Sequence, residues 1–106
     1  MVARGEIWLV NLDPTVGSEI RKARPCLVVS PGEMHDHLRT AIVAPMTTGS
    51  RPAPFRVSVV HDGKTGLILL DQMRTVDKSR MVKKLGMVSP KTLTVTLSAL
   101  QEAFAE

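Results

Sequence analysis

Short apolar runs rich in β-branched residues recur along the chain, and they constrain its fold more than any other feature. They are separated by glycine, proline and polar turn signals and cover residues 5–12, 26–30, 40–46, 55–60, 66–71 and 82–88. Such spacing is typical of an antiparallel sheet protein. The run 26–30, which follows Pro25, is too uniformly apolar to have a wet face and predicts a central strand. Asp62 and Gly63 favour a tight hairpin between two of the runs.

The last segment differs in kind, because its apolar residues recur at helical spacing. Ser89 is a suitable N-cap and Pro90 suits the first helical turn. One helix face carries Leu93, Leu97, Leu100 and Phe104, and we expect it to pack against the sheet. The 106 residues therefore predict one domain, 1–106, of mainly β (α+β) class: a small, strongly bent antiparallel sheet or partly open barrel with a C-terminal amphipathic helix. Sheets of this kind often close their edges by dimerisation.

The charge balance favours a polyanionic partner. Fourteen Lys and Arg residues against ten Asp and Glu give a net charge of +4, which is a weak indication of nucleic-acid binding. Cys26 is the only cysteine, which excludes an internal disulfide and a Cys-rich zinc site. The N-terminal apolar run is too short and interrupted for a signal peptide, and no run reaches the length of a membrane span. We expect a cytoplasmic protein.

Few residues are candidates for metal or nucleophilic chemistry. His35 and His37 flank Asp36, and in an extended segment they would point to the same side, but two ligands without a third favour a solvated loop over a metal site. Cys26 could be a nucleophile, although its apolar neighbours favour a buried, inert thiol. His61, beside the hairpin turn, is expected to face solvent. The sequence predicts neither a metal nor a cofactor.

Polar residues gather at the ends of the predicted strands. Arg24 precedes Pro25, which disfavours a helical conformation there and holds Arg24 extended at the mouth of its strand. Other polar residues end or follow apolar runs: Thr47, Thr48, Asp71, Gln72, Arg74, Thr75 and Asp77. If these strands are neighbours, their ends converge into one polar patch with a cation, hydroxyls and a carboxylate. The alternative, a surface ion pair from Arg24 to Glu19 or Asp71, is equally compatible with the spacing.

Two long blocks of the sequence resemble a known family. GEIWLVNLDPTVGSEIRKARPCLVVSP, residues 5–31, is similar to the opening of the MazF/PemK toxin endoribonucleases, with its W-containing strand, L-D-P-T-x-G-S-E and R-P. GLILLDQMRTVDKSRMVKKLGMVS, residues 66–89, resembles a second block with a D-Q-x-R-T-V-D core. With the terminal helix, the resemblance covers nearly the whole chain.

The resemblance implies the toxin of a toxin–antitoxin system. It implies a sequence-specific, metal-independent endoribonuclease that cuts single-stranded RNA, chiefly mRNA, by attack of the 2′-hydroxyl, leaving a 2′,3′-cyclic phosphate and a 5′-hydroxyl. The implied fold is a small SH3-like barrel of the MazF/CcdB/Kid type that forms a homodimer. An acidic, flexible MazE-like antitoxin segment is the implied partner, and no cofactor or membrane is involved.

The resemblance also assigns roles to residues. Arg24 stabilises the phosphorane and Thr47 donates a hydrogen bond to a phosphate oxygen, while Glu19 and Asp71 support them or act as acid or base. Some family members carry a histidine at the position of Ser18 and an arginine at that of Leu69, so neither group is available in this chain. The residues expected to bind RNA or support that binding are Ser18, Arg21, Lys22, Thr48, Arg51, Arg56, Gln72 and Arg74.

Two other functions stay open at this point. A gyrase poison of the CcdB type shares the implied fold but acts by binding a protein and cuts nothing. The second open function is that of a family member that binds RNA or an antitoxin without cleaving RNA. The Arg24–Pro25 pair and the D-Q-x-R-T block favour the nuclease, because their polar groups belong to a site that cleaves RNA.

Overall fold

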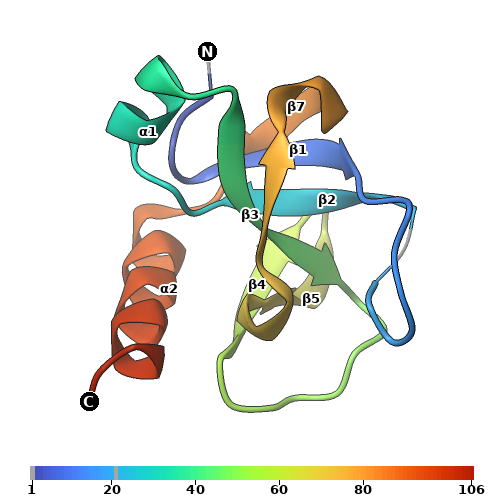
Figure 1. Cartoon of the computed structure of the whole chain (residues 1–106). Helices are drawn as coiled ribbons and strands as arrows, with labels where there is room; N and C mark the ends of the chain where they lie inside the picture. The colour runs from blue at the N-terminus through green and yellow to red at the C-terminus, as the bar shows by residue number, and fades with distance from the viewer. Residues whose placement is uncertain (1, 21) are drawn as a thin grey trace.

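A computed structural model describes residues 2–20 and 22–106 and contains one curled antiparallel sheet with a helix beside it (Figure 1). Its strands lie in the order β4-β5-β3-β2-β1-β7, and β6 pairs with β3 away from this path. The elements in chain order are β1 (Glu6–Asn11), β2 (Ala23–Val28), α1 (Gly32–His37), β3 (Thr40–Thr47), β4 (Arg56–His61), β5 (Lys64–Leu69), η1 (Leu70–Gln72), β6 (Arg74–Asp77), η2 (Lys78–Arg80), β7 (Met81–Met87) and α2 (Pro90–Ala103).

Strand β3 joins the two halves of the sheet. Its first half pairs with β6, from Thr40 opposite Asp77 to Val43 opposite Arg74. Its last two residues pair instead with β5, and its middle pairs with β2. Pro45 lies between the two pairings, after the last residue that pairs with β6 and before the first that pairs with β5. A proline is tolerated there because its missing N–H is not needed for pairing on that edge. The sheet therefore bends along β3.

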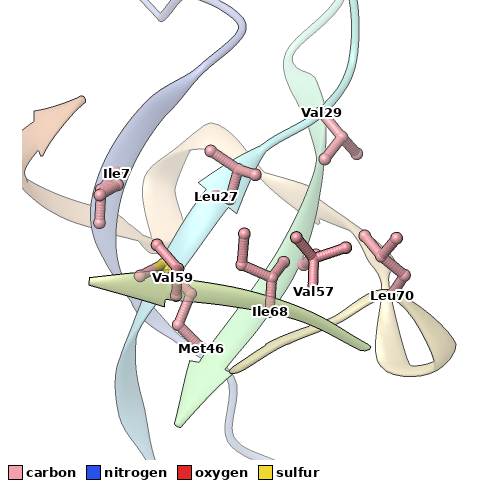
Figure 2. Packing of buried hydrophobic residues seen from close by; sticks show 9 residues of the cluster. Ile7, Leu27, Val29, Met46, Val57, Val59, Ile68 and Leu70 are labelled. Carbon is pink, nitrogen blue, oxygen red and sulfur yellow. The ribbon is translucent and has the colours of Figure 1, made fainter. Parts of the chain in front are cut away.

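Both faces of the sheet are buried at β2, which contributes side chains to two core clusters. Leu27 belongs to a core cluster that Figure 2 shows between β2, β3, β4 and β5, whereas Cys26 and Val28 belong to a second cluster on the other face. The predicted central strand is thus confirmed. The Cys26 thiol is fully buried, and burial raises its pKa to about 12, although Arg74 and Arg24 oppose this shift. The prediction of a buried thiol is confirmed, and the raised pKa makes Cys26 a weak nucleophile.

Trp8 belongs to the core in this chain. Its ring packs against the second cluster, and its indole N–H donates to the buried Glu6 carboxylate over 3.1 Å. The packing and this bond fix the indole ring against the protein core.

Four short elements, α1, η1, β6 and η2, were missing from the predicted fold, and β6 and α1 illustrate the reason. Strand β6 has four residues with one buried side chain, Val76, so it lacks the alternation that identifies a strand. Helix α1 has six residues and follows Pro31 without a side-chain cap, so it lacks both helical periodicity and a start signal.

The prediction of a solvated loop around His35 was wrong. The segment is helical, so His35 is buried while His37 is exposed. The His35 Nδ1 lies 3.0 Å from the Val2 carbonyl oxygen and must carry the proton, because a carbonyl only accepts. The Nε2 lies 2.6 Å from the hydroxyl of Ser30, which itself accepts the Ile42 N–H. His35 therefore fastens the N-terminal segment to the sheet.

The C-terminal helix starts as predicted, but its apolar face is less buried than predicted. Ser89 accepts the Thr92 N–H as an N-cap, and the fully buried side chain of α2 is Thr96. The apolar face is half-buried at Leu100, whereas Phe104 is 72% exposed because it follows the last turn of α2. No helix in the described part of the chain is both long and apolar enough to cross a membrane.

Gly66 allows β5 to approach β3 closely at Thr47. A Cβ atom at Gly66 would stand 2.7 Å from the Thr47 carbonyl oxygen and 3.2 Å from its carbonyl carbon, and both atoms are backbone. Thr47 pairs with the next residue of β5, Leu67. The absence of a side chain at Gly66 therefore sets the position of the end of β3.

We predict that Gly66→Ala lowers the free energy of unfolding by roughly 1–3 kcal/mol, because the added methyl group must push two paired strands apart. Gly32→Ala is the matched control, since a Cβ there meets nothing within 4 Å and the helical position favours alanine. Urea denaturation of the two variants and the parent chain measures the difference. Equal stability of all three proteins would contradict the close approach.

Candidate active site

The ends of β2 and β3 and the β4–β5 hairpin enclose a cavity of about 460 Å³, which we call the Arg24 cavity. It brings Arg24, which precedes one predicted strand, together with Thr47 and Thr48, which end another. Its other lining residues are Pro25, Met46, Val59, His61, Asp62, Lys64, Gly66 and Leu85.

Arg24 is positioned by backbone pairing. It lies in β2 opposite Val10 of β1, and the neighbouring Pro25 lies opposite Leu9. The strand after it is fully buried from Cys26 to Val28, so the backbone of Arg24 is continuous with the core. Its half-buried side chain lines the cavity, which places a guanidinium on a rigid base beside the end of β3.

Thr47 presents a hydroxyl whose orientation is fixed. It is half-buried at the end of β3, and its Oγ1 accepts the backbone N–H of Gly49 over 3.2 Å. Because that bond uses a lone pair of the oxygen, the hydroxyl hydrogen is available to donate to a group in the cavity. Thr48, the next residue, is exposed at the rim.

Asp71 is held by Arg56. The Arg56 Nε and Nη2 donate to the two carboxylate oxygens over 3.0 and 2.9 Å, in a bidentate pair. These bonds hold the pKa of Asp71 below its ordinary value, although partial burial opposes the shift. Arg56 also donates to the Arg51 carbonyl over 3.2 Å. The pair therefore ties the exposed loop of residues 48–55 to η1.

Glu19, Asp71, Gln72 and Arg74 line a second, smaller cavity of about 160 Å³, so the predicted polar patch is divided between two cavities. The Gln72 side-chain oxygen accepts the Ile20 N–H over 2.8 Å, and Arg74 donates to the Leu12 carbonyl over 3.0 Å. Both side chains therefore hold the β1–β2 loop, residues 12–22, against η1 and β6.

The β1–β2 loop is closed at its base and exposed at its tip. The Leu12 N–H donates to the Lys22 carbonyl, and the Lys22 N–H donates to the Asp13 carboxylate. At the tip, the Glu19 carboxylate accepts the Val16 N–H over 2.6 Å, and Ser18 is exposed. The side chain of Lys22 is exposed too. Arg21, which the sequence placed among the RNA-binding cations, lies outside the described residues.

His61 is less exposed to solvent than predicted. It is half-buried and lines the Arg24 cavity, because it continues the inward-facing series of Val57 and Val59 along β4. That alternation is the sequence signal that could have placed it correctly. The adjacent Asp62 and Gly63 have φ values of 53° and 73°, as a type I′ turn requires, so the predicted hairpin is confirmed.

The chemical character of the Arg24 cavity is that of an anion site. Arg24 and Lys64 supply cationic donors and Thr47 supplies a hydroxyl, while Asp62 lies at the turn. Guanidinium and hydroxyl donors suit phosphate oxygens. Within residues 2–20 and 22–106, no three His, Cys, Asp or Glu side chains gather closely enough to hold a metal ion.

The sequence is similar to known toxins. Residues 3–104 match the family described as PemK-like, MazF-like toxins of type II toxin–antitoxin systems. Endoribonuclease PemK of Escherichia coli is 45% identical over 96 residues, which cover 85% of this chain and 71% of PemK. Endoribonuclease EndoA of Bacillus subtilis is 33% identical over 111 residues, which cover 99% of this chain and 96% of EndoA.

The fold is similar to solved structures of MazF proteins. MazF from Deinococcus radiodurans has a TM-score of 0.84 and 26% identity, with 96% of this chain and 94% of that chain covered. An endoribonuclease in complex with its cognate antitoxin, from a mycobacterial species, has a TM-score of 0.81 and 26% identity, with 97% and 94% covered. The predicted bent sheet with a C-terminal helix is confirmed, and the chain belongs to the PemK-like, MazF-like toxin family of type II toxin–antitoxin systems.

Proposed function

We propose that this toxin is a sequence-specific, metal-independent endoribonuclease acting on single-stranded RNA, chiefly mRNA. The endoribonuclease activity follows from the family, since the PemK and EndoA proteins that it resembles over most of its length are endoribonucleases. The same relatives favour RNA cleavage over gyrase poisoning. The proposed reaction is attack of a ribose 2′-hydroxyl on the adjacent phosphate, giving a 2′,3′-cyclic phosphate and a 5′-hydroxyl.

The observation that carries this proposal is that Arg24 and Thr47 share one cavity. Attack within the nucleotide requires a base for the 2′-hydroxyl, an acid for the leaving oxygen and donors for the charge on the phosphorane. Arg24 is the donor at the phosphorane, and the Thr47 hydroxyl donates to a phosphate oxygen. An arginine is a poor base, because its guanidinium is not deprotonated in proteins.

The exposed loops on either side of the cavity are the proposed RNA contacts. Lys22 and Ser18 on the β1–β2 loop and Arg51 on the loop of residues 48–55 are exposed, so they can reach phosphates and base edges. Thr48 at the rim belongs to the same surface. Because aromatic residues make up 3% of the chain, base recognition depends on polar and backbone groups rather than on stacking.

The supporting residues act through the loops. Arg56, Gln72 and Arg74 contribute to RNA binding by holding these loops, since their side chains bond to other parts of the protein. Glu19 and Asp71 are proposed as supporting carboxylates for the same reason.

We propose a homodimer and an antitoxin as protein partners. Strand β7 ends the sheet and leaves Val82 and Met87 more than 60% exposed, and apolar edge strands are commonly covered by a second subunit. A similar endoribonuclease has been solved in complex with its cognate antitoxin. With a net charge of +4, this chain suits an acidic, flexible antitoxin segment. A cytoplasmic location, where mRNA is translated, stays a prediction.

We expect the purified protein to cut a mixed pool of single-stranded RNA in the presence of EDTA, because the proposed donors are side chains. Sequencing of the fragments from their 5′ ends, after enzymatic phosphorylation of the 5′-hydroxyls, tests cleavage and identifies the recognition motif together. Activity that disappears with EDTA would contradict metal independence. Intact RNA under all conditions would identify a member that does not cleave.

We expect Arg24→Ala to fold but to cut RNA roughly 100-fold to 1000-fold more slowly, as when a transition-state donor is removed from other enzymes. Arg39→Ala is the matched control, because Arg39 is exposed and lines neither cavity. Initial cleavage rates on one RNA that the parent chain cuts measure both variants. A rate for Arg24→Ala equal to that of Arg39→Ala would remove Arg24 from the mechanism.

We expect sedimentation at micromolar concentration to give twice the chain mass of 11.6 kDa. Burial of the apolar β7 edge is the driving force for this association. A single species of 11.6 kDa under these conditions would contradict the homodimer.

A further inference from the structure

The proposed reaction needs a proton acceptor for the 2′-hydroxyl, and neither Arg24 nor Thr47 can supply one near neutral pH. Asp71 is the obvious carboxylate in the sequence. It lines the other cavity, however, and both its oxygens accept bonds from Arg56. The acceptor should therefore be sought among the other residues that line the Arg24 cavity.

His61 is placed for this role by the pleat of β4. Val57 and Val59 are buried in the core, and His61 has the same parity along the strand, so its side chain leaves the backbone on the inward side. At the end of the strand the core gives way to the Arg24 cavity, which His61 lines together with Val59. Its backbone position is fixed by pairing with Lys64 across the hairpin turn.

The charged groups that line the Arg24 cavity together with His61 are Arg24 from β2, Lys64 from β5 and Asp62 from the turn. Guanidinium, ammonium and carboxylate groups ordinarily keep their charge between about pH 5 and pH 8, whereas imidazole changes its protonation in that range. Asp62 and Lys64 are exposed, but His61 is half-buried. In this cavity, His61 is thus the residue type suited to transfer a proton at neutral pH.

We propose that His61 is the general base of the RNA cleavage, an inference that rests on the proposed function. A neutral imidazole nitrogen takes the proton of the 2′-hydroxyl while the 2′-oxygen forms a bond to phosphorus. The bond from phosphorus to the 5′-oxygen breaks, and its electron pair stays on that oxygen, which takes a proton from water. The hydroxide left by that water removes the proton from the imidazolium, so the enzyme returns to its starting form.

The test uses the full-length protein and an RNA oligonucleotide that the parent chain cuts. Single-turnover rates in EDTA are measured from about pH 5 to pH 8, the range in which imidazole titrates, for the parent chain, His61→Gln, His61→Ala and His37→Gln. His37→Gln is the matched control, because His37 is exposed on α1 and lines neither cavity. Binding is measured with the same oligonucleotide carrying a 2′-deoxyribose at the cleaved position, and thermal unfolding checks the fold.

The parent chain and His37→Gln should lose activity as the pH falls, because protonated imidazole cannot accept a proton. At pH 8, His61→Gln should be slower by roughly 100-fold to 10,000-fold and should lack this pH dependence, while binding of the deoxy analogue is retained. Added imidazole should restore part of the activity of His61→Ala, since the cavity then has room for a free ring.

Three results would overturn the inference. A parent-like rate and pH profile in His61→Gln would remove His61 while leaving the proposed function intact. A loss of analogue binding as large as the loss of rate would make His61 a binding residue only. A parent chain that cuts no RNA would refute the base and the proposed nuclease together.

Discussion

The candidate site depends on one backbone arrangement, the pairing of β3 with two successive partners along one edge. The strand leaves β6 after Val43 and joins β5 at Met46, while β2 stays on its other edge. This change of partner brings the hairpin, the start of β2 and the end of β3 around one cavity. Gly66 permits the closest approach, because its missing side chain lets the Thr47 carbonyl lie against β5. A cavity made in this way is lined by strand ends, whose positions are fixed by the core.

The D-Q-x-R block, residues 71–74, holds two loops in place through side-chain hydrogen bonds. Asp71 binds Arg56, which in turn binds the carbonyl of Arg51 in the loop of residues 48–55. Gln72 accepts from Ile20, and Arg74 donates to Leu12, at the other loop. These loops are directly connected to Thr47 and Arg24. Polar residues that look catalytic in the sequence therefore stabilise the segments that flank the catalytic candidates.

The sequence predicted the sheet and the terminal helix because both rest on local signals. Alternation identified β4, uniform apolarity identified β2, and Ser89 with Pro90 identified the start of α2. The short elements α1 and β6 were not predicted, since neither is long enough to show a period. The bidentate bond between Arg56 and Asp71 could not be predicted, because it depends on how β4, β5 and η1 fold together in space. His61 is less exposed than its nearness to the turn predicts, because its parity along β4 places it on the side of Val57 and Val59.

The distribution of positive charge bears on the proposed competition between RNA and an antitoxin for this toxin. Arg56 and Arg74 are committed to holding loops, so their hydrogen-bond donors are engaged within the protein. Lys22 and Arg51 lie on exposed loops, and Arg24 and Lys64 line the Arg24 cavity. At these positions the proposed acidic antitoxin segment would meet the same groups as an RNA phosphate. The proposed competition between the two ligands requires no conformational change in the toxin, because both would use the same donors. Added salt would weaken the binding of both ligands, because both contact the same cations. The balance between antitoxin and RNA would therefore depend on shape and on contacts to bases.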